Sequence, residues 1–368
     1  MVGSTALIGT RKGLFTLTID DGEFSLSEPE FLGAPVTIAL RDPRDGARYA
    51  SLDHGHFGVH LHRDDGDGWT EIAAPEYPPK PEGHVDVNPM SQTEIEWTTQ
   101  LAWAIEPAHP DEPDVMWCGT IPGGLFRSGD RGASWQLVES LWNHPSRGRG
   151  FGGGYDDPGI HSISIDPRGP GRLMVGISCG GAWRTADGGE TWEVAARGMR
   201  ANFVPAEQAD DPEIQDPHRL ARSAADPDVL WCQHHCGIYR TTDDGDRWTE
   251  IPEAGPSTFG FAVATHPLDP DTAWFVPAIG DEVRVPVDGR FVVTRTRDGG
   301  RTFAVLTDRL PDGPSYDLVY RHCLDVDAGG DQLLLGSTTG SLWWSGDGGD
   351  SFRLVSANLP PILSARFS

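Results

Sequence analysis

Three histidines are placed where they could carry out chemistry together. His161 begins one short apolar run, His218 begins the next, and His235 lies in the turn that follows it. Neutral imidazole nitrogens bind divalent transition metals, and an imidazole can also act as a general base near neutral pH. These residues are therefore predicted to bind a divalent metal ion or to supply a catalytic base. The alternative for each histidine alone is an ordinary role in a turn, bonded to the backbone.

A second group of residues is suited to holding a small polar ligand. Its members are Arg11, Lys12, His54, His56, Arg284 and Arg321. A guanidinium group binds a carboxylate through two parallel hydrogen bonds, so Arg11, Arg284 and Arg321 could clamp an acidic group together. The alternative is that these arginines pair with carboxylates of a very acidic surface.

Paired carboxylates form a third group. Glu94 and Glu96 would lie on one face of an extended segment. Two carboxylates about 5–9 Å apart suit glycoside hydrolysis, so Glu94 is the catalytic candidate. Asp156 and Asp157 are a similar but weaker pair. The sequence shows no glycine-rich phosphate loop, no serine nucleophile elbow and no cysteine–histidine dyad.

These candidates need a scaffold, and a repeated motif indicates which one. The pattern Ser/Thr-x-Asp-x-Gly-x-x-Trp/Phe occurs at 128–135, 185–192, 241–248, 296–303 and 345–352, with a degenerate copy at 62–69. The aspartate can accept hydrogen bonds from amides of its own turn, and the glycine can take the positive φ of a tight reversal. The final aromatic residue starts the next strand and can pack between neighbouring sheets. The motif therefore predicts a hairpin corner with an aromatic plug.

The motif resembles the Asp box, or bacterial neuraminidase repeat, of sialidases and many other propellers. The whole chain is similar to a bacterial family of predicted cytoplasmic propellers with these repeats, often labelled glycosyl hydrolase or exo-sialidase. Sialidases hold a carboxylate with an arginine triad, beside a tyrosine–glutamate nucleophile pair and an acidic aspartate. The segment 283–286 (Val-Arg-Val-Pro) is similar to their Arg-Ile-Pro motif. It lies in the sixth unit instead of near the N-terminus, so a true sialidase is not expected.

The repeat spacing divides the chain into seven units. Six are continuous, at 36–74, 100–140, 159–197, 218–253, 259–309 and 316–358, and the seventh is split between 7–17 and 361–367. Each unit reads as four antiparallel strands. The sequence predicts a seven-bladed β-propeller that forms a single domain over residues 1–368. Pairing of the N- and C-terminal strands is predicted to close the ring, and a six-bladed ring is the alternative.

Successive repeats are farther apart than a plain blade requires, and the surplus lies in loops. Most of it falls at 75–99, 141–158, 198–217 and 277–290. In a propeller these loop classes open on one face, while the repeated turns lie on the other. The glycines of 150–161 would let the backbone approach a ligand closely. The candidate residues are therefore expected at one mouth of the axial channel.

Composition narrows the possible partners. The net charge of −26 argues against binding a nucleic-acid backbone, where neutralising phosphates dominates affinity. No apolar run approaches the roughly 20 residues of a membrane span, and the N-terminus does not resemble a signal peptide. Five cysteines without a zinc-ribbon spacing fit a reduced, cytoplasmic chain.

Together these patterns predict a hydrolase or lyase that acts on a small polar or saccharide ligand at the axial mouth. The only cofactor they suggest is a divalent metal ion held by the histidines. The alternative is a non-catalytic propeller that serves as a binding or assembly platform. The sequence does not determine the oligomeric state.

Overall fold

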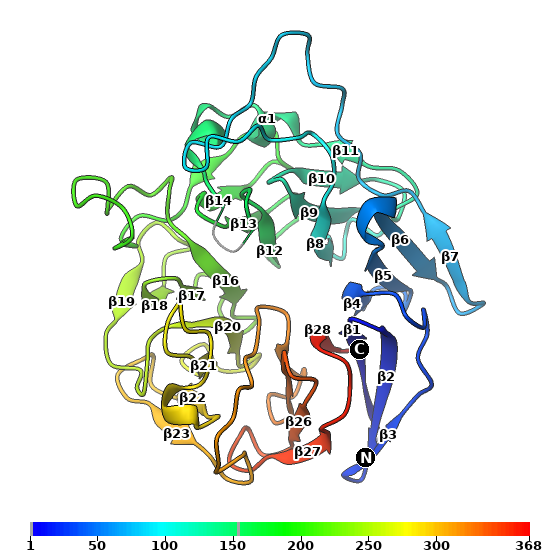
Figure 1. Cartoon of the computed structure of the whole chain (residues 1–368), viewed down its shortest axis with the longest axis vertical. Coiled ribbons are helices and arrows are strands. Elements are labelled where there is room, and N and C mark those ends of the chain that lie inside the picture. Colours follow the sequence, from blue (N-terminus) through cyan, green and yellow to red (C-terminus); the bar gives the residue numbers. More distant parts are fainter. Residues whose placement is uncertain (1–2, 153–154) are drawn as a thin grey trace.

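The computed structural model describes residues 3–152 and 155–368, and they form a ring of seven four-stranded antiparallel sheets (Figure 1). The predicted seven-bladed propeller is therefore confirmed over the six-bladed alternative. The blades are numbered here in chain order, each from its innermost strand outward.

The first blade combines the two ends of the chain. Blade 1 consists of β28 (Ile362–Phe367), β1 (Ser4–Thr10), β2 (Gly13–Asp20) and β3 (Glu23–Leu26). Blade 2 consists of β4 (Val36–Arg41), β5 (Arg48–Asp53), β6 (Val59–Asp64) and β7 (Trp69–Ile72). Blade 3 consists of β8 (Leu101–Pro107), β9 (Met116–Ile121), β10 (Leu125–Ser128) and β11 (Gln136–Leu137).

The remaining blades are continuous in sequence. Blade 4 consists of β12 (Ile160–Ile165), β13 (Leu173–Ile177), β14 (Gly181–Thr185) and β15 (Glu193–Val194). Blade 5 consists of β16 (Pro217–Arg222), β17 (Leu230–His234), β18 (Gly237–Thr241) and β19 (Thr249–Ile251). Blade 6 consists of β20 (Gly260–Thr265), β21 (Ala273–Pro277), β22 (Val293–Thr296) and β23 (Ala304–Leu306). Blade 7 consists of β24 (Leu324–Val326), β25 (Leu333–Gly336), β26 (Leu342–Ser345) and β27 (Arg353–Ser356).

Helices occur only in connections of the described chain. They are α1 (Glu139–Trp142) and the 3-10 turns η1 (Gly55–Phe57), η2 (Pro145–Arg149) and η3 (Val287–Gly289). None of the helices in this part of the chain is long and apolar enough to cross a membrane.

Strand β28 closes the ring, as the sequence predicts. It runs antiparallel to β1, with Ile8 opposite Ala365 and Ala6 opposite Phe367. Figure 1 shows this red strand beside the blue β1 on the inner rim. The closure pairs the inner edge of β1 with β28, and an exposed edge of that kind otherwise invites aggregation.

Apolar side chains pack between neighbouring blades and so form a ring of interfaces. Between blades 4 and 5, for example, Met174, Leu220 and Trp248 belong to one buried cluster. The Trp248 side chain is 1% exposed, and its indole N–H donates to the Ala195 carbonyl of the preceding blade at 2.7 Å. The aromatic residue that ends the repeated motif therefore acts as the predicted plug between sheets.

Replacing Trp248 by alanine is expected to lower the free energy of unfolding by about 3–5 kcal/mol, because it leaves a large cavity and an unpaired carbonyl between two blades. Urea unfolding followed by fluorescence would measure this. Leu354→Ala, at a position that is 51% exposed, is the matched control and should stay within about 0.5 kcal/mol of the parent. Equal losses in the two variants would contradict the plug.

The five repeated turns share one hydrogen-bond pattern. In the turn at 185–192, the Thr185 hydroxyl donates to Asp187 Oδ1 at 2.7 Å, and the Gly189 amide donates to Thr185 Oγ1 at 3.0 Å. The amide and hydroxyl of Thr191 also donate to the Asp187 carboxylate, at 3.0 and 2.6 Å. Gly189 has φ +91°, which explains the glycine. These carboxylates are thus occupied by their own turns and serve the architecture.

The aspartates of the repeated turns are expected to make the stability of the chain depend on pH. Hydrogen bonds from Thr191 lower the pKa of Asp187 to about 2, and Thr302 does the same for Asp298, against an ordinary value of 3.8. The folded chain therefore binds fewer protons than the unfolded chain, so this contribution is present above about pH 4 and is lost as pH falls towards 2. Urea unfolding between pH 5 and 2.5 should show a falling free energy of unfolding.

The Asp187→Asn/Asp298→Asn double variant should show a shallower fall over the same pH range. Asp312→Asn is the control, because the Asp312 side chain is 92% exposed and lies outside the repeated turns. Parallel slopes in all three proteins would contradict the assignment of acid sensitivity to these turns.

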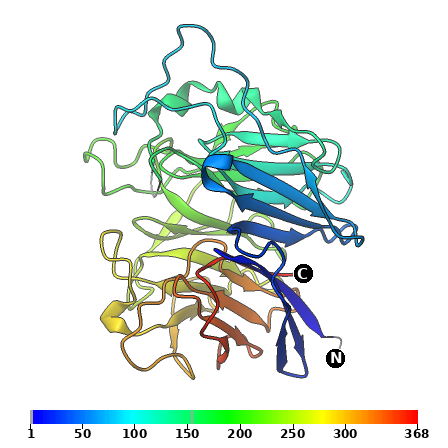
Figure 2. The same ribbon diagram turned by 45° about the vertical axis from the view of Figure 1, so that its right-hand side comes forward.

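The alternating strand directions place two classes of connection at the same end of the blades. These are the turns from second to third strand and the connections from an outermost strand to the next innermost strand. The long segment 73–100, which joins β7 to β8, projects from the upper blades in Figures 1 and 2. The connection before β16 extends to the left in Figure 2. The predicted loops are thus present, and the repeated turns lie at the opposite end.

Candidate functional site

A cavity of about 370 Å³ opens at the inner rim of the ring, on the face with the long connections. Its polar and aromatic lining consists of Arg11, Asp53, Trp103, Tyr155, Arg284, Tyr320, Arg321 and His322. Thr37 of β4 and Leu363 of β28 also line it, which places it beside innermost strands. We call it the axial cavity.

Arg321 is the most unusual group in the axial cavity. The residue is 6% exposed, and its guanidinium lies 4.8 Å from the Trp103 ring centroid and 5.4 Å from that of Phe261. Its Nε and Nη2 atoms have no hydrogen-bond partner among the described residues. Burial lowers the pKa of Arg321 to about 10, so the group is still charged at neutral pH. A buried cation with free donors at a cavity favours an anionic ligand.

The structure brings the three predicted arginines to this one cavity. Arg284 lies 5.3 Å from the Phe261 ring centroid and is partly neutralised by Asp281, at 2.5 Å between Nη2 and Oδ1. Arg11 lies in the turn between β1 and β2 and lines the same cavity. The predicted grouping of Arg11, Arg284 and Arg321 therefore holds as geometry.

His322 lines the cavity and has one ring nitrogen without a hydrogen-bond partner among the described residues. Arg219 can only donate, so its contact of 3.2 Å with His322 Nδ1 makes that nitrogen an acceptor. Burial lowers the pKa of His322 well below its usual range, so the ring is neutral and carries its proton on Nε2. Nε2 is buried and has no acceptor within residues 3–152 and 155–368. An oxygen of a ligand could accept this proton in a hydrogen bond.

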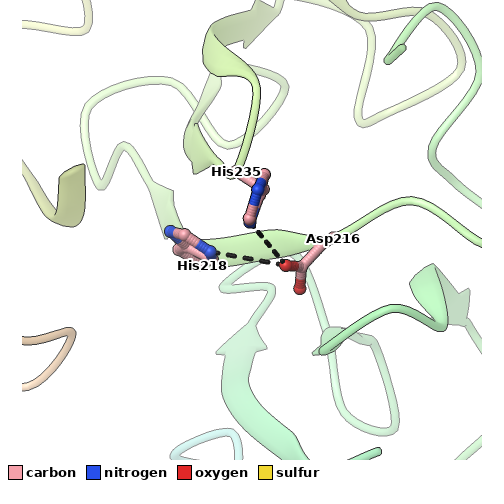
Figure 3. Close-up of side chains that lie close together, drawn as sticks. All are labelled: Asp216, His218 and His235. Carbon is pink, nitrogen blue, oxygen red and sulfur yellow. Dashed lines mark ion pairs between the residues drawn. The ribbon is translucent and has the colours of Figure 1, made fainter. Parts of the chain in front are cut away.

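A separate cluster, which we call the 216 cluster, contains Asp216, His218 and His235 (Figure 3). Asp216 Oδ2 lies 3.4 Å from His218 Nε2 and 3.3 Å from His235 Nδ1. The side chains of Asp216 and His218 are fully buried, and that of His235 is 20% exposed. Burial alone would raise the pKa of Asp216, but the two imidazoles bring it well below the usual range. Burial lowers the pKa of His218, although Asp216 acts in the opposite direction.

The 216 cluster revises the predicted histidine trio. His161 is fully buried on β12, with its ring centroid 5.2 Å from that of Trp103 and its Nδ1 2.9 Å from Ser162 Oγ. It is not part of the cluster, whose third member is Asp216. Asp216 stands two residues before His218, and such residues face the same side of an extended segment. That spacing was the available signal, although the Asp-Pro pair also fits an ordinary turn.

The other sequence candidates lie away from the axial cavity. His54 and His60 have ring centroids 4.9 Å apart and line a separate outer hollow, and His56 packs on Phe57 at 3.9 Å between centroids. Lys12 is exposed in the turn after β1. These three predicted ligand-binding residues are therefore not joined to Arg321 by the structure.

Glu94 is also outside the cavity. It lies in the segment 73–100, where Lys80 Nζ holds its carboxylate at 2.7 Å. Among the described residues, the carboxylate that lines the axial cavity is that of Asp53, which is not one of the site residues predicted from the sequence. Of the glycine-rich loop at 150–161, Gly153 and Gly154 lie outside the described residues.

Comparisons with known proteins point to glycoside hydrolases. A probable oligoxyloglucan-reducing end-specific xyloglucanase of Neosartorya fischeri is 24% identical over 318 residues, 76% of this chain and 35% of the relative. An oligoxyloglucan-reducing end-specific xyloglucanase of Emericella nidulans is 26% identical over 257 residues, 64% of this chain and 28% of the relative. The chain thus spans about a third of the length of these relatives.

Solved structures with a similar fold include an ancestral GH74 enzyme, with a TM-score of 0.58 and 15% identity over 90% of this chain and 38% of that chain. YCF48 bound to D1 peptide has a TM-score of 0.54 and 14% identity, over 92% of this chain and 88% of that chain. No family model matches the chain, so the resemblance to the neuraminidase-repeat family stays a prediction. The chain is nevertheless a β-propeller similar to those of glycoside hydrolases.

Proposed function

We propose that the chain is a glycoside hydrolase that binds an acidic saccharide in the axial cavity. The observation that carries this proposal is the buried, unpaired guanidinium of Arg321. The xyloglucanase relatives support a saccharide substrate. Arginine side chains at the cavity favour a sugar that carries a carboxylate over a neutral one.

Four of the lining residues then have a part in binding. Arg321 holds the sugar carboxylate through Nε and Nη2, which have no hydrogen-bond partner among the described residues. Arg11 and Arg284 add positive charge beside it. The Nε2 proton of His322 binds a ring or hydroxyl oxygen. These contacts orient the saccharide with its glycosidic bond towards the remaining polar groups.

Asp53 and Tyr155 are the groups that could carry the reaction. Burial raises the pKa of Tyr155, although Arg321 acts in the opposite direction, so the phenol keeps its proton at neutral pH. We assign Asp53 as the base that takes a proton from water while the water oxygen attacks the anomeric carbon. Tyr155 donates its proton to the leaving oxygen as the glycosidic bond breaks, and solvent returns a proton from Asp53 to Tyr155.

A panel of model glycosides tests this function directly. The purified chain should release the aglycone from uronic acid glycosides faster than from neutral glucosides, xylosides or xyloglucan oligosaccharides. Sialosides belong in the panel, although release of sialic acid is not expected. Absence of turnover and of binding across the panel would refute the proposal.

A second candidate is a binding platform without catalysis. Asp53 is the one carboxylate among the described lining residues, whereas glycoside hydrolysis usually uses two. YCF48, a propeller of similar fold, is bound to D1 peptide in its structure. This candidate predicts saturable binding of an acidic ligand with no turnover, which the same panel would reveal.

We also propose a bound metal ion and a cytoplasmic location. Metal assistance has one candidate place in the described chain, the 216 cluster, which adjoins the axial cavity through Phe261. A cytoplasmic location is supported by the five cysteines, all of which are free thiols.

A further inference from the structure

The ligand atoms of the 216 cluster face one another without hydrogen bonds. Asp216 Oδ2, His218 Nε2 and His235 Nδ1 are all buried atoms that lack a hydrogen-bond partner in the described residues. Buried polar atoms are nearly always paired, because leaving one unpaired costs about 1–3 kcal/mol. Three such atoms at one point indicate that something else binds there.

The hydrogen bonds around the cluster leave lone pairs directed at this point. His218 Nδ1 lies 2.7 Å from the Gly260 carbonyl oxygen, which can only accept, so Nδ1 carries the proton. A neutral His218 therefore presents the lone pair of Nε2 to Asp216. The other carboxylate oxygen of Asp216 accepts the Cys179 amide at 3.0 Å, which leaves Oδ2 free.

Two lone pairs that face each other repel unless a cation or a hydrogen-bond donor such as water lies between them. The distances of 3.4 and 3.3 Å from Asp216 Oδ2 to the two imidazoles exceed the range of good hydrogen bonds. They match the separation of about 3.4 Å between ligand atoms that each lie about 2.1 Å from a tetrahedral metal ion. All three atoms lie within 4.8 Å of one another.

We propose that Asp216, His218 and His235 bind a divalent transition metal ion, with Zn²⁺ as its best match. Two imidazole nitrogens and one carboxylate oxygen suit zinc or iron and not calcium or magnesium, which prefer oxygen. The partially exposed His235 provides the route from solvent. The Gly260 carbonyl and the Cys179 amide hold the ligands in place, as outer partners of metal ligands typically do.

The cluster lies next to the axial cavity but does not line it. His218 stacks on Phe261 at 4.6 Å between ring centroids, and the guanidinium of Arg321 covers the same ring. A bound ion would therefore sit behind the cavity wall and add positive charge near Arg321. The metal site does not rest on the hydrolase function, and its test needs no substrate.

Calorimetric titration with Zn²⁺ tests the site in the full chain after treatment with a chelator. The parent should bind one equivalent, and Co²⁺ should give the visible absorption bands of a tetrahedral site. His235→Ala and Asp216→Asn should weaken Zn²⁺ binding by at least the roughly 10- to 100-fold that loss of even an outer partner costs. His109→Ala is the matched control, since its side chain is 12% exposed and lies outside the cluster.

The outcomes separate a metal site from its alternatives. Equal Zn²⁺ affinity in the parent and His235→Ala would overturn the proposal. The point between the three side chains would then be assigned to a water molecule. A loss in His109→Ala as large as in His235→Ala would overturn it in favour of scattered surface histidines. Thermal unfolding of each variant shows which ones are folded. If Asp216→Asn does not fold, His235→Ala still tests the metal site, because the His235 side chain is partly exposed.

Discussion

The Arg321→Met variant is expected to lose binding of an acidic saccharide by about 100- to 10,000-fold. Two hydrogen bonds from a charged donor contribute about 1.5–3 kcal/mol each, and every 1.4 kcal/mol changes affinity tenfold. Arg321 provides two such donors, Nε and Nη2, which the fold itself does not use in the described chain. Calorimetric titration with a uronic acid glycoside from the active panel would measure the loss.

The same variant should keep or gain stability, which separates a binding role from a structural one. Arg321 is a buried charge without an ion-pair partner among the described residues, and its burial opposes folding. Methionine fills a similar volume between Trp103 and Phe261 without that cost. Arg284→Met is the control, and it should lose affinity only about tenfold because Asp281 already neutralises Arg284 in part. A clearly lower free energy of unfolding for Arg321→Met, together with an unchanged affinity for the glycoside, would contradict the binding role.

Deleting residues 362–368 is expected to prevent stable folding altogether. This removes the innermost strand of blade 1, together with Ile362 and Ala365, which are 1% and 0% exposed. It also removes Arg366, whose guanidinium binds the Glu106 carboxylate of β8 at 2.8 and 3.1 Å. Losing these contacts should remove most of the free energy of unfolding, which is roughly 5–15 kcal/mol for a typical domain.

Near-ultraviolet circular dichroism and gel filtration would measure the effect of this deletion. The truncated chain should give no cooperative thermal transition and should elute as aggregates, because β1 becomes an open edge. Removing Ser368 alone is the control, since that residue follows β28 and leaves the strand intact. A truncated chain with the parent's unfolding temperature would show that the ring does not depend on β28.

The fold could be predicted because each blade is encoded by a short local sequence pattern. Each repeated turn carries its own hydrogen-bonded aspartate and plug, so the five copies and the degenerate one marked six blades, and the strands predicted at the two chain ends gave the seventh. The arginine group followed from the same logic, since Arg11 and Arg284 lie in turns between second and third strands, which share one face with the segment before β24.

The candidate site was harder to predict because the long connections between blades carry no repeated sequence motif. Glu94 was misleading because the segment 73–100 satisfies it internally with Lys80. His54 was misleading because η1 follows it directly and the segment leads to an outer hollow. Asp216 and Asp53 were missed because both sit at strand ends where aspartate commonly belongs to a turn. Only the packing of different blades shows what these side chains face.

The split blade has a consequence for how the protein is made. Within residues 3–152 and 155–368, strand β1 is made before every other strand, and its inner partner β28 is made after all of them. The ring therefore cannot close before β28 has been made, and the contact that closes it joins residues more than 350 positions apart, such as Ala6 and Phe367. Until β28 is made, β1 stays an open edge on a nascent chain of this architecture, and chaperones protect such exposed edges.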